Sequence, residues 1–141
     1  MKFMMIVKAS KDSEAGQMPS QELLGEMTKY NEQLMKAGVL VDLAGLKPSS
    51  EGFRIKFSGG KRTLIDGPFA ETKELIAGYW IINVKSREEA VSWAQRVPDL
   101  MGPGKDAILE VRPYFELEDF EPGEGVDRAR KLEKEFGKQK K

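Results

Sequence analysis

The sequence contains no cysteine and no histidine. Without cysteine the chain has no disulfide, no thiolate nucleophile and no zinc site built on sulfur. Without histidine it lacks the commonest metal ligand and the commonest general base at neutral pH. Any chemistry in this chain therefore depends on carboxylates, lysine, tyrosine or a bound cofactor.

The chain also lacks a net charge and a long hydrophobic run. Its 23 basic and 23 acidic residues cancel, so bulk charge favours neither nucleic acid nor an anionic membrane. The apolar run from Phe3 to Val7 is too short for the core of a signal peptide, and no segment approaches the roughly 18 apolar residues of a membrane span. At 141 residues the chain is long enough for one domain. We therefore expect a soluble cytoplasmic protein with no nucleic-acid or membrane partner.

Hydrophobic periodicity predicts two long helices and six strands. One helix lies between an N-cap at Ser20 and a C-terminal cap at Gly38, and the other runs from a capping box at Ser86 to Arg96. Gly59 and Gly60 indicate a hairpin turn between two of the strands, the first of which alternates as a half-buried strand does. The predicted strands are residues 3–7, 39–43, 53–57, 62–65, 78–84 and 107–111, with a short helix at 71–75.

Without the hairpin, the order is strand, helix, strand, strand, helix, strand, which predicts an α+β fold of the ferredoxin-like split βαβ type with an antiparallel sheet. Two helices can cover only one face of that sheet. The strongest strand nevertheless places Trp80 and Ile82 on one face and Tyr79 and Ile81 on the other. A second copy of the chain is the simplest cover for the second apolar face, so we expect a homodimer with its sheets face to face.

The C-terminal part of the chain has a different composition. Acidic residues dominate from Glu116 to Glu124, and a charged helix with a thin apolar stripe is predicted at 126–136. Two interpretations stay open, weak docking of this helix on the domain or its partner, and mobility. We expect a domain at residues 1–115 and a charged extension at residues 116–141.

Residues 66–74 combine a turn, several carboxylates, a lysine and an aromatic ring. In the structural interpretation Asp66 caps its own turn through its carboxylate, Gly67 supplies a positive φ and Pro68 fixes the exit. In the functional interpretation the turn places the Asp66 carboxylate in a pocket, where burial raises its pKa and makes it a general acid or base. Phe69 is then a pocket wall, or otherwise fills the core.

Other side chains are candidate ligand contacts, each with a structural alternative. Glu71, Lys73 and Glu74 form a solvated charged turn, or else Glu71 or Lys73 assists Asp66. The paired carboxylates of Glu71 and Glu74 can bind a divalent cation, but this spacing is unspecific and we expect no metal. Tyr30 and Tyr79 either fill the core or contact a ligand. Arg62, on the hairpin, either holds an anionic ligand or is solvated.

The run from Asp66 to Glu74, followed by Gly78-Tyr79, resembles the DGPF signature of the YCII-related family. Further likenesses, in the family's order, are Gly45-Leu46-Lys47-Pro48, Ser86 with Glu88-Glu89-Ala90-Val91, and Glu110-Val111-Arg112-Pro113. The resemblance covers nearly all of residues 1–115. It implies a dimeric α+β barrel with a pocket between sheet and helices or at the dimer junction.

The resemblance also implies an active site, since a histidine–aspartate pair is the one proposed for YCII-related proteins. This chain has no histidine, so only the acidic member of that pair can be present here. Asp66 is the best candidate for it. Relatives of the fold include isomerases, monooxygenases and dehalogenating enzymes, and many DGPF genes are associated with alternative sigma factors. Two hypotheses follow. One is a homodimeric small-molecule-binding or regulatory module with a pocket lined by Phe69, Tyr79 and the first long helix. The other is a cofactor-independent isomerase or lyase that uses Asp66, assisted by Glu71 or Lys73. We expect no cofactor in either case.

Overall fold

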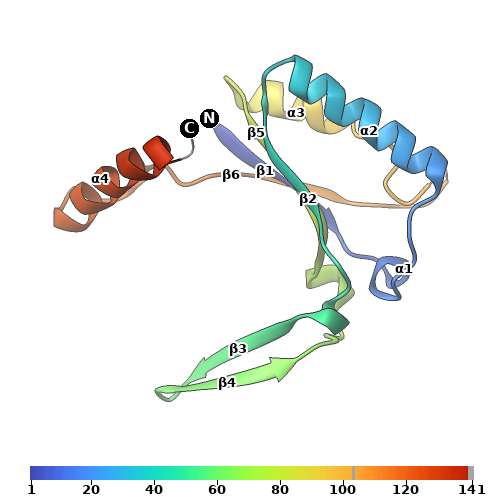
Figure 1. Cartoon of the computed structure of the whole chain (residues 1–141), viewed down its shortest axis with the longest axis horizontal. Coiled ribbons are helices and arrows are strands. Elements are labelled where there is room, and N and C mark those ends of the chain that lie inside the picture. Colours follow the sequence, from blue (N-terminus) through green and yellow to red (C-terminus); the bar gives the residue numbers. More distant parts are fainter. Residues whose placement is uncertain (103, 140–141) are drawn as a thin grey trace.

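A four-stranded antiparallel sheet is the centre of the molecule (Figure 1). The computed structural model describes residues 1–102 and 104–139. The strand order is β2-β5-β1-β6, and each neighbouring pair is antiparallel. The strands are β1 (Lys2–Lys8), β2 (Leu40–Gly45), β5 (Ile76–Asn83) and β6 (Leu109–Pro113). This topology confirms the predicted α+β, ferredoxin-like split βαβ fold.

Two helices cover one face of this sheet, and local caps determine where they begin. Helix α2 (Gln21–Lys36) begins after Ser20, whose hydroxyl accepts a hydrogen bond from the Leu23 amide at 3.1 Å. It ends before Gly38, which has a φ of +74°. Both predicted caps of the first long helix are therefore confirmed.

Helix α3 (Arg87–Gln95) has only half of the predicted capping box. The Ser86 hydroxyl accepts a hydrogen bond from the Glu89 amide at 3.1 Å. The Glu89 carboxylate, however, accepts from the Lys85 amide at 2.8 Å instead of the Ser86 amide. The predicted capping box was therefore wrong in its second hydrogen bond, from the Ser86 amide to the Glu89 carboxylate, because this carboxylate binds the Lys85 amide.

The remaining elements lie outside the central sheet. They are α1 (Lys11–Glu14), the 3₁₀ turns η1 (Ser49–Glu51), η2 (Thr72–Glu74) and η3 (Leu117–Asp119), the hairpin strands β3 (Phe53–Ser58) and β4 (Lys61–Asp66), and the C-terminal helix α4 (Glu124–Gln139). The sequence did not predict α1, a single turn whose cap is formed by Ser10 and Ser13. The short helix expected at 71–75 is the 3₁₀ turn η2.

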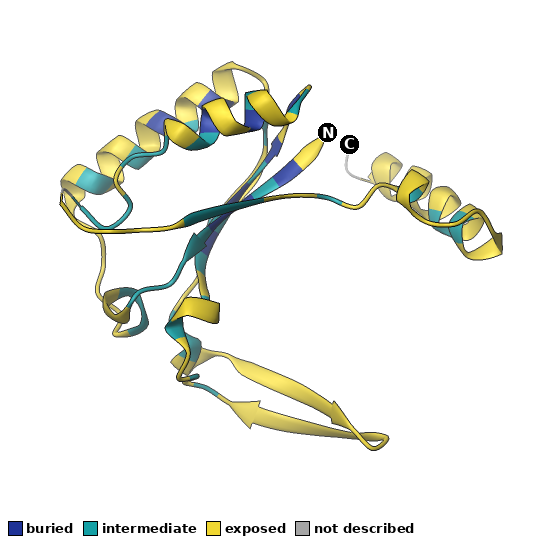
Figure 2. Cartoon of the chain, turned by 180° about the vertical axis from the view of Figure 1, so that it is seen from behind, coloured by how far each residue is buried: buried dark blue, intermediate teal, exposed yellow. Residues whose placement is uncertain are grey.

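The hydrophobic core lies between the two helices and the sheet face that they cover. Its largest fully buried side chains are Met5 on β1, Leu34 on α2 and Ile82 on β5. Figure 2 shows the buried residues concentrated on these facing surfaces. The core cluster comprises Phe3, Met5, Tyr30, Leu34, Val39, Trp80, Ile82, Val84, Ala90 and Trp93.

No helix packs on the opposite face of the sheet in the described part of the chain, and we call it the open face. Its side chains alternate with those of the core. Because Met5 pairs with Trp80 and Met4 with Ile81, the residues Met4, Tyr79 and Ile81 lie on the open face. They are only partly covered, so the second apolar face predicted from the sequence is present.

The hairpin β3–β4 projects from the sheet on the side of the open face (Figure 1). Its predicted strands are confirmed, and Gly59 and Gly60 have positive φ at the turn. The alternation in β3 predicted a half-buried strand, and this was wrong, because every residue of β3 and of its partner β4 is exposed. The described residues of the protomer therefore leave the hairpin's apolar side chains largely exposed.

Tyr30 of α2 connects the two helices inside the core. Its hydroxyl donates a 2.7 Å hydrogen bond to the carbonyl of Trp93, and its ring makes edge contacts with Trp80 and Trp93. Burial raises the pKa of Tyr30 to about 12, an effect that the positive charge of Arg96 partly offsets. Tyr30, a candidate ligand contact in the sequence, thus lies in the core with its hydroxyl already bonded.

The raised pKa of Tyr30 predicts a loss of stability in strong base. The unfolded chain releases this proton near pH 10 and the folded chain near pH 12, so the contribution is complete below pH 10 and is lost as the pH rises to 12. The complete loss amounts to about 3 kcal/mol, and about half of it is reached at pH 11. Urea unfolding, followed by tryptophan fluorescence at about pH 8 and about pH 11, measures that half. Tyr30→Phe has no phenol to ionise, so the variant does not lose this stability in base. The difference in unfolding free energy between parent and variant is therefore expected to narrow with rising pH. A difference that stays constant would contradict a raised pKa for Tyr30.

Candidate functional site

The Asp66-Gly67-Pro68 turn is held by contacts that differ from the predicted ones. Gly67 is not among the glycines with positive φ. A Cβ at Gly67 would instead lie 1.8 Å from the carbonyl oxygen of Ser49, so the position requires glycine for close approach of two backbone segments. The Asp66 side chain makes no hydrogen bond within the described residues, and the prediction that it caps its own turn was wrong.

Ser49 holds the turn in place of Asp66. Its hydroxyl accepts a hydrogen bond from the Phe69 amide at 3.0 Å and donates one to the Glu14 carboxylate, which also accepts from the Ser49 amide at 2.9 Å. The Gly67 amide donates to the Gly52 carbonyl at 3.0 Å. These bonds connect α1, η1 and the base of the hairpin. Sequence reasoning missed them because Glu14 and Ser49 are 35 positions apart.

The residues that the sequence suggested around Asp66 do not share one cavity in the protomer. Asp66 pairs with Phe53 across the hairpin and is exposed. Phe69 lies against the other face of the hairpin, with the Arg54 guanidinium 3.8 Å from the centre of its ring. Arg62 lies over the ring of Phe57 at 5.0 Å. Two further candidates, Glu71 and Lys73, are exposed at η2.

Tyr79 occupies a different position, on the open face of the sheet. Its hydroxyl donates a hydrogen bond of 3.2 Å to the Asp42 carboxylate on the neighbouring strand β2. This bond and the negative charge of Asp42 raise the pKa of Tyr79 above its usual value. The same charge, with burial as the larger cause, raises the pKa of Tyr114. The open face therefore carries two protonated phenols beside one carboxylate.

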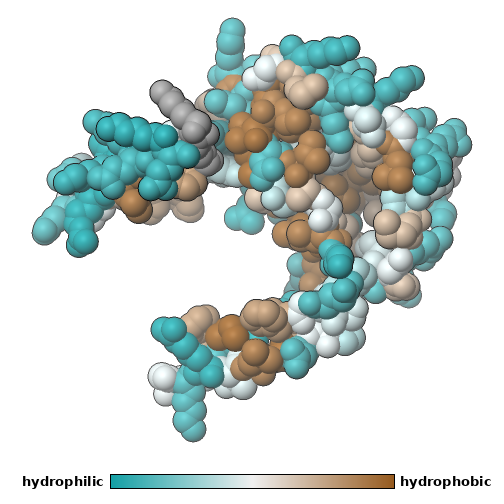
Figure 3. All heavy atoms as spheres, in the orientation of Figure 1, coloured by the Kyte–Doolittle hydropathy of each residue, from teal (hydrophilic) through white to brown (hydrophobic). Residues whose placement is uncertain are grey.

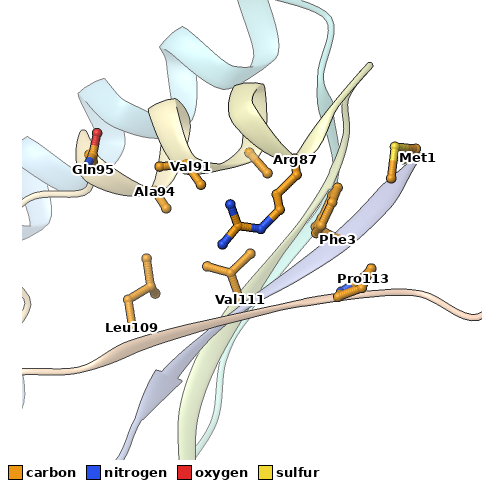
Figure 4. Close-up of a pocket in the computed structure, with 10 residues that line it drawn as sticks. Met1, Phe3, Arg87, Val91, Ala94, Gln95, Leu109, Val111 and Pro113 are labelled. Atoms are coloured by element: carbon orange, nitrogen blue, oxygen red, sulfur yellow. The ribbon is translucent and has the colours of Figure 1, made fainter.

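A cleft of about 460 Å³ lies on the other side of the sheet, between α3 and β6 (Figure 4). It exists because α3 has nine residues and α2 has sixteen, so the side of the sheet near β6 is less completely covered. Leu109 and Val111 of β6 remain half-exposed there. The lining residues are Met1, Phe3, Arg87, Ala90, Val91, Ala94, Gln95, Leu109, Val111 and Pro113.

Arg87 is the one charged side chain among the residues that line this cleft. Figure 4 shows its guanidinium extending between α3 and β6 toward Val111. In the described part of the chain no carboxylate forms a salt bridge with it. The sequence carries a signal for this position, because Arg87, Ala90, Val91 and Ala94 have the spacing of one helix face. Sequence reasoning did not single out Arg87, a cation on the same helix face as these apolar residues.

The described residues offer no obvious site for a cation. No group of three or more aspartate and glutamate side chains among residues 1–102 and 104–139 is arranged to hold a metal ion. Within the same residues, none of the helices combines the length and the hydropathy that a membrane span needs. The arrangement that remains is an apolar cleft with a single guanidinium.

Comparison with known proteins identifies the family. The model of the YCII-related domain matches residues 1–118. The chain belongs to the YCII-related family. This confirms the resemblance seen in the sequence, and α4 lies beyond the matched residues of the YCII-related domain.

One protein is similar to this chain in sequence and another in structure. An uncharacterized protein of Rhizobium meliloti (strain 1021) is 31% identical over 104 residues, which cover 74% of this chain and 80% of that protein. Among solved structures, 5-chloro-2-hydroxyhydroquinone dehydrochlorinase from Burkholderia phenoliruptrix AC1100, in complex with 2,5-dihydroxybenzoquinone, is 16% identical with a TM-score of 0.46. That match covers 82% of this YCII-related chain and 94% of the other.

Proposed function

We propose that this YCII-related chain is a homodimeric binding protein for a small amphipathic anion, which is held in the cleft between α3 and β6. The observation that carries the proposal is Arg87, an exposed residue whose guanidinium extends across an apolar cleft and has no salt-bridge partner in the described part of the chain. A volume of about 460 Å³ with apolar walls and one convergent polar group is typical of sites for small organic molecules.

The chemistry of the cleft defines the class of ligand. A guanidinium donates two parallel hydrogen bonds to a carboxylate, and the walls formed by Val91, Leu109 and Val111 favour a hydrocarbon or aromatic body. Gln95 is the other polar side chain of the lining, and no carboxylate, lysine or tyrosine lines the cleft. The cleft can therefore hold a small carboxylate but provides no general acid or base of the usual kinds, which favours binding over turnover.

The open face supports the homodimer. A second copy of the chain, packed sheet to sheet, covers Met4, Tyr79 and Ile81 with side chains of the same kind. Figure 3 shows hydrophobic residues along the concave side of the molecule, over the sheet and the hairpin. The cleft lies on the helix side of the sheet, so it stays accessible when the open faces meet.

Binding of 3-phenylpropionate and its neutral amide tests the assignment of Arg87. The carboxylate is expected to bind at least tenfold more tightly than the amide, because hydrogen bonds to a charged group contribute about 1.5–3 kcal/mol. Arg87→Gln is expected to remove this preference. Amide chemical shifts in a ¹H–¹⁵N NMR titration report both the affinity and the location, with the largest changes expected in α3 and β6.

A matched variant separates a specific anchor from general charge. Lys29→Gln removes one positive charge from an exposed position of α2 and is expected to leave both affinities unchanged. Equal binding of the acid and the amide, or shifts centred on the open face, would contradict the proposed site.

The enzymatic alternative with Asp66 stays a prediction. One observation favours it, since Asp66 lies on the same hairpin face as Phe53, and a partner that covers this face also desolvates the carboxylate. Desolvation raises the pKa of a carboxyl group, as a general base for an isomerase or lyase reaction requires. A structure of the dimer in which Asp66 is still exposed to solvent excludes this alternative.

A further inference from the structure

The C-terminal arm, residues 116–139, is a structured segment that extends away from the body of its own protomer (Figure 1). Its helix α4 carries an apolar stripe of Val126, Ala129, Leu132 and Phe136 at helical spacing. Leu132 is 64% exposed and Phe136 54% exposed. Most helical stability in proteins comes from packing of an apolar face, so contact of Leu132 with another surface would stabilise α4.

Several contacts hold the arm together. The Arg130 guanidinium donates a 3.3 Å hydrogen bond to Glu118, and the rings of Phe115 and Phe120 are 5.3 Å apart. A backbone hydrogen bond, followed by the bond from Arg130, lowers the pKa of Glu118. The Glu116 amide donates to the Asp119 carboxylate at 2.7 Å. These contacts hold α4 against η3 and Phe120 against Phe115, so the arm is a structured unit.

The hairpin β3–β4 presents the second uncovered apolar surface. Strand pairing places Leu64 opposite Ile55, and Phe53 and Phe57 on the same face. Their exposed fractions are 62% for Phe53, 41% for Ile55, 68% for Phe57 and 57% for Leu64. We call these four residues the hairpin face.

The first half of the arm and the hairpin differ in charge. Residues 53–66 of the hairpin carry four basic side chains and one acidic one, and pairing places Arg62 and Asp66 on the hairpin face. Residues 116–127 of the arm carry six acidic side chains, whereas residues 128–139 carry five basic and two acidic ones. Charge complementarity of this kind guides the choice and register of partners. In Figures 1 and 2 the hairpin and the arm lie at opposite ends of the concave side, so they do not meet within one chain.

We infer that in the homodimer the C-terminal arm of each subunit packs against the hairpin face of the other. This inference rests on the dimer proposed above. In a dimer with twofold symmetry this contact forms twice, so both arms and both hairpin faces are paired. The hairpin face and the arm each expose on the order of 400 Å² of apolar area, so two such contacts bury roughly 1,600 Å², the size of a standard stable interface.

The absence of cysteine allows a direct test by cross-linking. Two differently tagged full-length chains, one with Phe57→Cys and the other with Leu132→Cys, are co-expressed and treated with a short bismaleimide. We expect a cross-linked species of dimer mass that contains both tags. Leu64→Cys in place of Phe57→Cys is expected to give the same product, and Lys134→Cys, on the opposite side of α4, a severalfold lower yield.

Every other outcome would overturn the proposed contact between the arm and the partner's hairpin face. Efficient cross-linking of Leu132→Cys to itself means that α4 pairs with α4. Cross-linking at monomer mass in a chain with both cysteines means that the arm folds onto its own hairpin. No cross-link in a sample that still sediments as a dimer refutes this contact alone. Sedimentation of the parent chain as a monomer refutes the proposed dimer as well.

Discussion

Gly67→Ala is expected to detach the base of the hairpin from η1. The added Cβ would lie 1.8 Å from the Ser49 carbonyl oxygen and 2.7 Å from its carbon, and both belong to backbone that cannot rotate away. Relief of the clash breaks the hydrogen bonds from Gly67 to Gly52 and from Phe69 to Ser49. The combined cost is about 3 kcal/mol.

Hydrogen exchange measures this effect where it occurs. Amides of β3 and β4 are expected to exchange about a hundredfold faster in Gly67→Ala, the factor that corresponds to about 3 kcal/mol, because they open with the detached turn. Gly52→Ala is the matched control. Its Cβ would lie 3.7 Å from the same Ser49 oxygen, an ordinary contact, and Gly52 has an extended backbone. Similar exchange in the two variants would show that the close approach at Gly67 is unimportant.

Met4→Lys is expected to convert the proposed dimer into a folded monomer of 15.8 kDa. Met4 lies in the middle of the open face, paired with Ile81 on one side and Arg112 on the other. A lysine there would place a second cation beside Arg112 in a desolvated interface. Burial of an unpaired charge costs several kcal/mol, so dimerisation weakens by about a thousandfold or more.

Sedimentation velocity across micromolar concentrations tests this prediction, and tryptophan fluorescence shows whether the variant is folded. Met18→Lys is the matched control, since Met18 is 80% exposed in the segment before α2. The control is expected to sediment as the parent does. A Met4→Lys variant that remains dimeric would show that the open face is not the interface.

The sequence predicted the central fold well because its signals are local. Alternation in β5 and the caps at Ser20 and Gly38 each depend on a few neighbouring residues, and all three are confirmed. The order of strands and helices then leaves few topologies to consider. Packing of the two helices follows from the apolar stripes, including Leu34, which is fully buried.

The candidate site was harder to predict because its determinants are distant in sequence or depend on the backbone. Gly67 was recognised as necessary, but the reason lies in the position of Ser49, eighteen residues earlier. For Tyr30 the sequence favoured a core position but left a ligand contact open, and only the hydrogen bond of its hydroxyl to the Trp93 carbonyl shows that the side chain is already engaged in the core. Arg87 was predictable from the helical spacing, yet its importance depends on the incomplete cover over β6, which the sequence does not display.

The direct pairing of β2 with β5 has a consequence for how this chain can vary. Gly45 pairs with Gly78, and the Leu46 amide donates to the Ala77 carbonyl at 2.8 Å, so the chain leaves the sheet and returns to it at one point. Residues 47–75, which include the hairpin, are tied to the scaffold by the bond from the Ser49 amide to Glu14 and by the bond from the Ala9 amide to the Leu75 carbonyl. Within this segment the Gly67 amide donates to the Gly52 carbonyl, so the chain also enters and leaves the hairpin at one point. The hairpin beyond that point can therefore be exchanged, shortened or replaced, while the scaffold keeps its four strands and the cleft beside α3.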